Sequence, residues 1–171
     1  MLGAAAAGRR TYLADSFSGI PRQNAKTKGL VLAEDQDAHK ITVLNSNSYQ
    51  RVRQSAIALG LDVQERVRFE VGYFNETLPA LVAREPNISF SILRLDGDTY
   101  SSTKEALQVL YPRLSPGGFV VVDDWHDWHG CRDAVTEFRD EHAVDAKLIM
   151  IPHGPPRDAP SKSSEHIGDS F

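Results

Sequence analysis

Two apolar runs in this sequence each end at acidic residues, and this feature constrains the fold more than any other. The runs span 89–95 and 117–122, and the acids that follow them are Asp96, Asp98, Asp123 and Asp124. A strand needs no charge at its end, so the acids require a functional explanation. In a parallel sheet, ligands bind beyond the carboxyl ends of the strands. The pattern therefore predicts that these carboxylates meet at one ligand-binding edge.

The rest of the chain alternates between strand and helix patterns around an irregular loop at 23–47. Further strands are expected at 11–17, 66–74 and 146–152, and helices at 46–61, 76–84 (broken near Pro79), 103–114 and 131–142. This alternation predicts right-handed crossovers and an α/β fold, with a parallel sheet and helices on both faces. The apolar runs "FVVV" and "LIMI" are typical of strands buried on both sides.

Length, charge and composition narrow the class of protein. A chain of 171 residues fits one domain, which we expect at 1–153, followed by a disordered tail at 154–171 that is rich in Pro, Ser and charge. The formal net charge of −4 gives no general attraction to nucleic acid or to an anionic membrane. No apolar run reaches about 18 residues, so no membrane span is expected. The N-terminal segment lacks the pattern of a secretory signal, and we expect a cytoplasmic protein.

The acids at the strand ends suit a divalent cation. Asp96, Asp123 and Asp124 are expected within several ångströms of one another, where unpaired carboxylates repel and at least one pKa rises. Oxygen ligands fit Mg²⁺, which can hold a substrate hydroxyl and lower its pKa. Asp98 directly precedes a helix pattern, so an N-cap explains it as well as a place in the site.

Longer segments of the chain resemble one known family. They are "YLADSFSGIP", "VRFEVGYFNETLP", "LRLDGDTYSSTKEALQVLYPRLSPGGFVVVDDW" and "GCRDAV", in this order. Over about residues 10–145 the chain resembles the macrocin O-methyltransferase (TylF-like) family, whose members are S-adenosylmethionine-dependent enzymes with a Rossmann-like fold. The resemblance implies methyl transfer to a hydroxyl of a sugar or another secondary metabolite. It also implies a small-molecule acceptor and a homo-oligomer.

The resemblance assigns roles to particular residues. It implies that Mg²⁺ is held by Asp96, Asp123 and Asp124, and that Asp96 also takes the proton from the acceptor hydroxyl. It places Asp15 at the ribose of S-adenosylmethionine. The other residues implied to bind this cofactor are Ser16 and Phe17 in the same motif, and Gly72, Tyr73 and Phe74 near the adenine.

The chain departs from the family ahead of Thr11. The family has a first strand and a Gly-rich turn before its "ADSF" motif, and both are missing here. Because that strand lies in the middle of the sheet, its two neighbours are expected to have unpaired backbone edges. We therefore expect a partial methyltransferase sheet.

Two other functions remain open from the sequence. The "DGD" segment could clamp a metal and diphosphate in a glycosyltransferase, which would leave Asp123 and Asp124 without a role. A chain that lacks the first strand could also be a methyltransferase fragment without activity. His126 and His129 follow the second acidic pair, so zinc or iron is a further option for the metal.

Overall fold

The computed structural model describes residues 9–18, 48–126 and 129–151. The loop expected at 23–47 and the tail expected at 154–171 lie outside these residues. Within the described part, no helix is both long enough and apolar enough to cross a bilayer.

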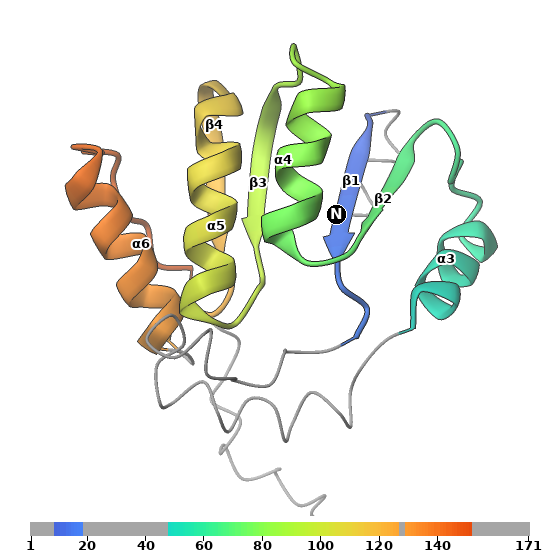
Figure 1. The fold of residues 1–171 in the computed structure, drawn as a ribbon, viewed down its shortest axis with the longest axis horizontal. Helices are drawn as coiled ribbons and strands as arrows, with labels where there is room; N and C mark the ends of the chain where they lie inside the picture. Colours follow the sequence, from blue (N-terminus) through green and yellow to red (C-terminus); the bar gives the residue numbers. More distant parts are fainter. Residues whose placement is uncertain (1–8, 19–47, 127–128, 152–171) are drawn as a thin grey trace, which may run out of the picture.

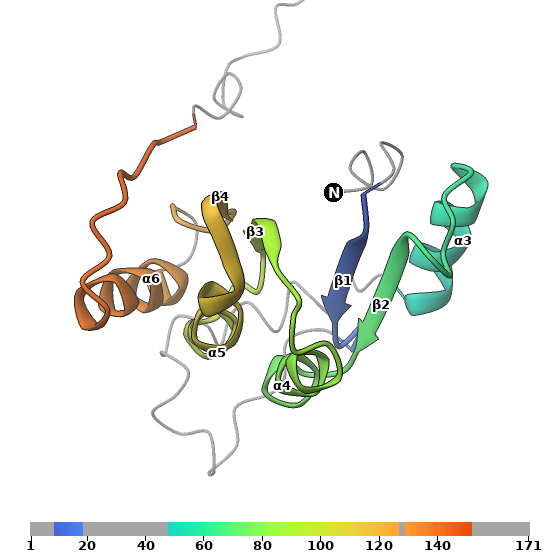
Figure 2. The ribbon, with the colours of Figure 1, turned by 90° about the horizontal axis from the view of Figure 1, so that it is seen from above.

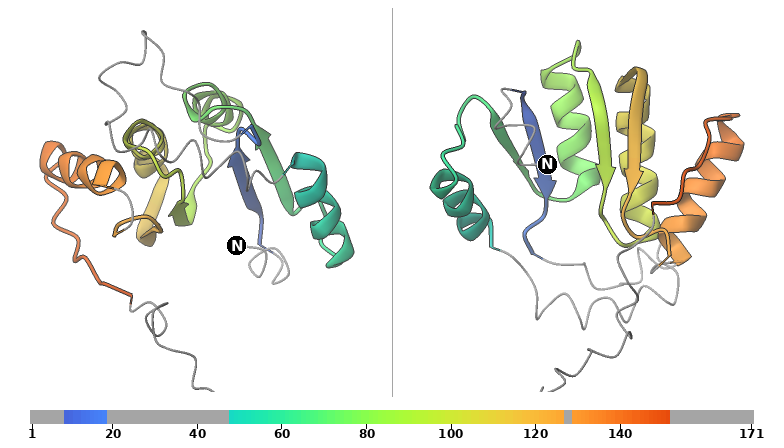
Figure 3. Two further views of the ribbon diagram at one scale, coloured as in Figure 1. Left: turned by 90° about the horizontal axis from the view of Figure 1, so that it is seen from below. Right: turned by 180° about the vertical axis from the view of Figure 1, so that it is seen from behind.

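The strands of the described part form two separate parallel pairs. β1 (Thr11–Asp15) pairs with β2 (Val67–Val71), and β3 (Phe90–Leu95) pairs with β4 (Leu114–Val122). The row runs β2, β1, β3, β4 (Figures 1 and 3), but among the described residues no ladder joins β1 to β3. The expected parallel α/β architecture is therefore confirmed, with unpaired edges in its middle.

Helices follow the strands, namely α3 (Tyr49–Ala58), α4 (Phe74–Arg84), α5 (Tyr100–Leu110) and α6 (His129–Glu141), and a 3₁₀ turn (Tyr111–Arg113) follows α5. A polar side chain caps the N-terminus of two of these helices, α3 and α5. The Ser48 hydroxyl caps α3 by accepting the Arg51 amide at 3.3 Å. Figure 2 shows α4 and α5 on the same side of the strands, with α3 and α6 at opposite ends of the row.

The expected break at Pro79 is wrong, because α4 continues through this residue. Proline lacks the N–H that donates to the preceding turn, so it removes one helical hydrogen bond. Leu78 and Leu81 flank it and are only 2% and 1% exposed. Their packing holds the helix together on both sides of the proline.

The strand expected at 146–152 is also wrong for the part that the structure describes. Residues 146–151 form no ladder with any described strand, and Ile149 and Ile151 are 72% and 71% exposed. An apolar run becomes a strand only where a neighbouring edge satisfies its backbone groups. Among the described residues, no such edge lies alongside this segment.

The hydrophobic core lies between β3 and the helices α4, α5 and α6. Its buried members are Leu78, Leu95, Ala106, Leu107, Val135 and Phe138. Alternation along the strands sends Leu93 and Leu95 into this side, whereas Ile92 and Phe119 on the other side are 54% and 68% exposed. The core thus fixes the carboxyl ends of β3 and β4, where the acidic residues begin.

Candidate functional site

Three acidic side chains meet beyond the carboxyl ends of β3 and β4. One carboxylate oxygen from each of Asp96, Asp98 and Asp124 lies within 4.8 Å of the other two. The backbone N–H of Asp98 donates to Oδ2 of Asp124 at 3.3 Å. Asp98 has a φ of 61°, in the left-handed region that Asp tolerates better than most residues. The turn after β3 therefore folds toward the end of β4 and brings the carboxylates together.

The N-cap of α5 is Thr99, and Asp98 does not serve as the cap. The Thr99 hydroxyl accepts the Ser102 amide at 3.3 Å, and the Ser102 hydroxyl donates to the carbonyl of Gly97 at 2.6 Å. A Cβ at Gly97 would lie 2.7 Å from the Ser102 hydroxyl oxygen, so this close turn requires glycine. The N-cap interpretation of Asp98 is wrong, and its side chain belongs to the acidic cluster.

Arg94 connects two of the three carboxylates that the sequence assigns to a metal. Its guanidinium lies 2.7 Å from Oδ2 of Asp96 through Nη1 and 2.7 Å from Oδ2 of Asp123 through Nη2. Residues two apart on a strand point to the same face, which places Arg94 and Asp96 together and leaves Leu95 in the core. Asp123 is thus held in an ion pair with Arg94, while Asp124 lies in the acidic cluster.

The acidic cluster carries more negative charge than its surroundings neutralise. The pKa of Asp124 is raised to about 7, mainly by burial and then by the neighbouring carboxylates of Asp98 and Asp96. Burial also raises the pKa of Asp96, although Arg94 acts in the opposite direction. Such crowding is the condition that a bound cation relieves. The donor atoms are carboxylate oxygens, which fit Mg²⁺.

Cys131 is buried beside this cluster, and it has no nucleophilic role. Its side chain is 1% exposed, and burial raises the pKa of the thiol to about 11. A reactive cysteine needs a lowered pKa and access to solvent. The Cys131 thiol therefore lacks the features of a reactive cysteine.

The residues expected at the cofactor lie at the carboxyl ends of β1, for the ribose, and of β2, for the adenine, on the same edge of the molecule. The exposed carboxylate of Asp15 accepts the Phe17 amide through Oδ1 at 2.6 Å. Gly72 donates its N–H to the carbonyl of Asp15 at 3.0 Å. Gly72 has a φ of 144°, and a Cβ at this position would lie 2.8 Å from Thr77 Cγ2, so both the backbone and the space exclude larger residues. The charge of Asp15 also raises the pKa of Asp96, so the two halves of the edge influence one another.

The two other residues of the "ADSF" motif have local partners. The Ser16 hydroxyl accepts the Ser18 amide at 3.1 Å. The ring of Phe17 packs edge-on against Tyr49 at a centroid distance of 5.7 Å and lies 6.4 Å from Phe69. This aromatic contact joins the end of β1 to the start of α3, and it holds the turn that carries Asp15.

Tyr73 and Phe74 lie at the start of α4, beyond the end of β2. Tyr73 is 43% exposed and available to a ligand. Phe74 packs against the hydrophobic core, and its ring approaches the Gly97 turn. Phe74 thus connects the β2 end of the edge to the turn that carries the acidic cluster.

Sequence reasoning missed Arg94 and underrated Asp98, whereas the histidines stay outside the cluster. The spacing Arg94, Asp96, Asp98 repeats every two residues, and this alternation is the signal that could have drawn attention to both. His126 is exposed and His129 begins α6, and neither contributes to the carboxylate cluster found among the described residues.

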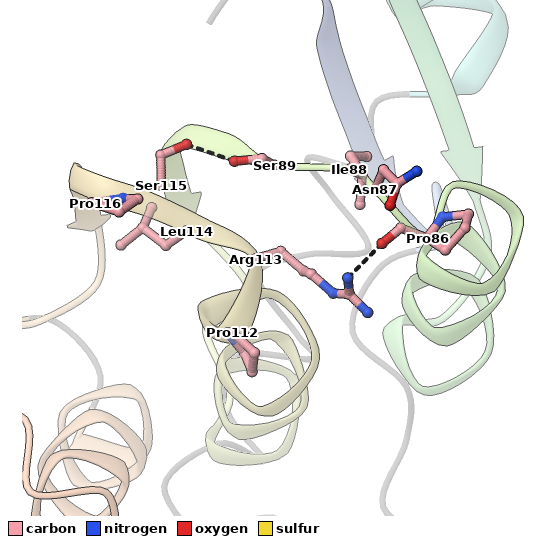
Figure 4. A pocket seen from close by; sticks show the side chains of 9 residues that line it. All are labelled: Pro86, Asn87, Ile88, Ser89, Pro112, Arg113, Leu114, Ser115 and Pro116. Carbon is pink, nitrogen blue, oxygen red and sulfur yellow. Dashed lines mark hydrogen bonds between the residues drawn. The ribbon is translucent and has the colours of Figure 1, made fainter.

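A separate open pocket lies at the other end of β3 and β4, between segments 86–89 and 112–116 (Figure 4). Arg113 Nη1 donates to the carbonyl of Pro86 at 2.6 Å, and the hydroxyls of Ser89 and Ser115 are 2.6 Å apart. Its lining contains no acidic residue. The carboxylates therefore define the candidate site, and this pocket does not.

Comparison with known proteins assigns the chain to a family. The family described as Macrocin-O-methyltransferase (TylF) matches residues 1–154. The chain belongs to the TylF family. As a TylF-family protein, it has relatives that are named as O-methyltransferases.

Two curated relatives illustrate this TylF-family membership. The 8-demethyl-8-(2,3-dimethoxy-alpha-L-rhamnosyl)-tetracenomycin-C 4'-O-methyltransferase of Streptomyces olivaceus is 38% identical over 143 residues, which cover 84% of this chain and 52% of the relative. The mycinamicin III 3''-O-methyltransferase of Micromonospora griseorubida is 34% identical, with coverage of 84% and 54%. The TylF-family chain therefore spans about half the length of the curated relatives that it matches.

A solved structure supports the same assignment at the level of the fold. The O-methyltransferase NovP is 36% identical and superimposes with a TM-score of 0.73, covering 84% of this chain and 56% of NovP. The parallel strand pairs and their helices are thus those of a methyltransferase sheet.

Proposed function

We propose that this TylF-family chain acts in the S-adenosylmethionine-dependent, Mg²⁺-dependent O-methylation of a hydroxyl on a sugar or another secondary metabolite. The observation that carries the proposal is the position of Asp15 and the acidic cluster on one edge of the strands. A cofactor held at the ends of β1 and β2 would thereby lie beside a cation held at the ends of β3 and β4. The relatives named as O-methyltransferases of a rhamnosyl-tetracenomycin and of mycinamicin III support the class of acceptor.

The proposed metal ligands are Asp96, Asp123 and Asp124, and the position of Asp98 adds a fourth carboxylate. A bound Mg²⁺ supplies charge that lowers the pKa of an acceptor hydroxyl and orients it. The crowding that raises the pKa of Asp124 supports cation binding, because a cation offsets the repulsion among Asp96, Asp98 and Asp124.

Asp96 is the proposed base. Burial raises its pKa, so its carboxylate accepts a proton more readily than an ordinary aspartate. The charge of Asp15 contributes to this rise, which supports a proton acceptor that interacts with the proposed cofactor end. S-adenosylmethionine brings an already activated methyl group, so the chain needs mainly to orient the acceptor and hold its proton.

Asp15 is proposed to accept hydrogen bonds from the cofactor ribose. Its carboxylate is exposed, and the Phe17 amide and the Gly72 turn hold its position. Gly72, Tyr73 and Phe74 are proposed to lie near the adenine, with Ser16 and Phe17 completing the β1 end. The exposed ring of Tyr73 offers a surface on which a base can stack.

The glycosyltransferase alternative gains no support from the relatives named above, all of which are methyltransferases. The chain spans about half the length of its curated relatives, so the inactive-fragment alternative stays open. The binding experiment described next decides it. The cytoplasmic location, the homo-oligomer and the small-molecule acceptor remain predictions.

The experiment that tests the proposed function is calorimetric titration of the full chain with S-adenosylmethionine, with and without Mg²⁺. A thermal scan first establishes cooperative unfolding. Saturable binding that Asp15→Asn weakens would support the proposal, and Asp133→Asn, at an exposed position on α6, is the matched control. A chain that unfolds cooperatively but binds no cofactor would contradict it, and a chain without a cooperative transition would favour the inactive fragment.

A further inference from the structure

We propose that Arg94 is an internal cation that competes with the metal ion for Asp96 and Asp123, so that its guanidinium must leave these two carboxylates before a divalent cation can bind them. This inference rests on the metal site of the proposed function. It gives Arg94 a regulatory role, because the strength of its two ion pairs sets the apparent affinity for metal.

The geometry that carries the inference comes from the pairing of β3 and β4. In this ladder Arg94 lies opposite Val121 and Leu95 opposite Val122. The next residues, Asp96 and Asp123, therefore follow side by side at the two strand ends. Arg94 sits one same-face position before them, and each of its terminal nitrogens contacts a different carboxylate at 2.7 Å.

The guanidinium contacts two carboxylates of the proposed ligand set. Asp96 also belongs to the acidic cluster through one of its oxygens, and Asp123 is held by Arg94 at the end of the neighbouring strand. A metal ion on these carboxylates would place two positive charges beside a third in the guanidinium, and like charges at contact distance repel. The guanidinium in its present position therefore opposes a divalent cation at Asp96 and Asp123.

The exposure of Arg94, Asp96 and Asp123 allows the two ion pairs to break and a cation to take the place of the guanidinium. The side chains of Arg94, Asp96 and Asp123 are 36%, 44% and 45% exposed, so breaking their ion pairs returns the groups to water. Exposed ion pairs contribute little to stability, because water screens the charges. A fully buried pair would leave an uncompensated charge and would resist displacement. The Arg94 guanidinium can therefore leave Asp96 and Asp123 when a divalent cation binds these carboxylates.

The experiment measures binding of Mn²⁺, as a probe for the divalent cation, to the full chain and to two variants. Arg94→Met keeps much of the apolar stem and removes the guanidinium. Arg84→Met is the matched control, because it removes one positive charge from an ion pair with Glu70 on β2. Free Mn²⁺ is followed by electron paramagnetic resonance, and thermal unfolding is followed in EDTA.

We expect Arg94→Met to bind Mn²⁺ roughly three- to tenfold more tightly than the unaltered chain, a range that follows from the loss of two exposed ion pairs. It should also unfold at a lower temperature in EDTA, because Asp96 and Asp123 then lack a counter-ion. Arg84→Met should leave the Mn²⁺ affinity unchanged.

Unchanged or weaker Mn²⁺ binding by Arg94→Met would overturn the inference and leave the proposed metal site intact. Equal tightening by Arg84→Met would also overturn it, since net charge alone would then explain the effect. Absence of Mn²⁺ binding by all three proteins would overturn both the inference and the metal part of the proposed function, while cofactor binding would still be testable by calorimetry.

Discussion

The backbone N–H of Asp123 donates to the carbonyl oxygen of Leu95 at 3.0 Å. This hydrogen bond continues the β3–β4 ladder to its carboxyl end, and it places the acids that follow the two strands beside one another. The ligand-binding edge is therefore built on a fixed backbone contact. The predictions below concern the charges and side chains that this contact brings together.

Asp124→Asn should weaken Mn²⁺ binding by about tenfold or more, because Asp124 is the buried member of both the predicted ligand set and the observed cluster. Binding of S-adenosylmethionine in EDTA should stay within about twofold, since Asp15 lies at another strand end. Calorimetry with each ligand separates the two effects. Asp133→Asn, exposed on α6, should change neither affinity, and a loss of Mn²⁺ binding there would point to a non-specific charge effect.

Stability in EDTA should fall as the pH rises from about 4 to about 7. The pKa of Asp124 is about 7 in the folded chain and near 3.8 when unfolded, so the folded chain keeps a proton that the unfolded chain has released. Asp124 therefore adds no penalty below about pH 4, and its penalty develops as the pH rises and levels off above about 7, with a limiting slope of about 1.4 kcal/mol per pH unit.

Thermal or urea unfolding at several pH values checks this sign. Asp124→Asn should flatten the dependence and raise the melting temperature at pH 8, because asparagine keeps an oxygen that can accept the Asp98 amide but carries no charge. An unaltered slope in Asp124→Asn would show that other groups cause the dependence.

Asp15→Asn should weaken binding of S-adenosylmethionine by about tenfold, which corresponds to loss of a charge-assisted hydrogen bond. Asparagine can still accept the Phe17 amide, so the turn after β1 should keep its shape. Mn²⁺ affinity should stay within about twofold of the unaltered chain. Calorimetry is the measurement, and an unchanged cofactor affinity would remove Asp15 from the proposed site.

Leu78→Ala should lower the free energy of unfolding by about 3 kcal/mol, because Leu78 is 2% exposed and its truncation leaves a cavity in the core. Leu59→Ala is the control, since Leu59 is 65% exposed and should change stability by less than about 0.5 kcal/mol. Urea unfolding followed by circular dichroism measures both. Similar losses in the two variants would contradict the position of the core.

The sequence predicted the parts of the fold that depend on local patterns. The strands at β1 and β3 and the helix at α3 follow from alternation, apolar runs and capping residues, all of which lie within a few positions of one another. The location of the acids at one edge also follows, because parallel strands share the direction of their carboxyl ends.

The remaining features depend on contacts between distant segments. The pairing of Arg94 with Asp123 requires the register of β3 on β4, which no local pattern contains. The continuity of α4 at Pro79 depends on core packing by its neighbours. Whether the segment expected as a strand at 146–152 forms one depends on whether a partner strand edge exists. Local preference gave the wrong result at both of these places because tertiary contacts decide them.

Among the residues that the structure describes no ladder joins β1 to β3, and this gap has a consequence for how the proposed site is assembled. The cofactor end belongs to one strand pair and the acidic end to the other, and in the described part α4 contacts β1 and β2 on one side and α5 on the other. Side-chain packing around α4, and not a hydrogen-bonded ladder, therefore determines how far Asp15 lies from Asp96. A larger or smaller side chain on α4 would therefore change the distance between methyl donor and acceptor, although neither Asp15 nor Asp96 had been altered.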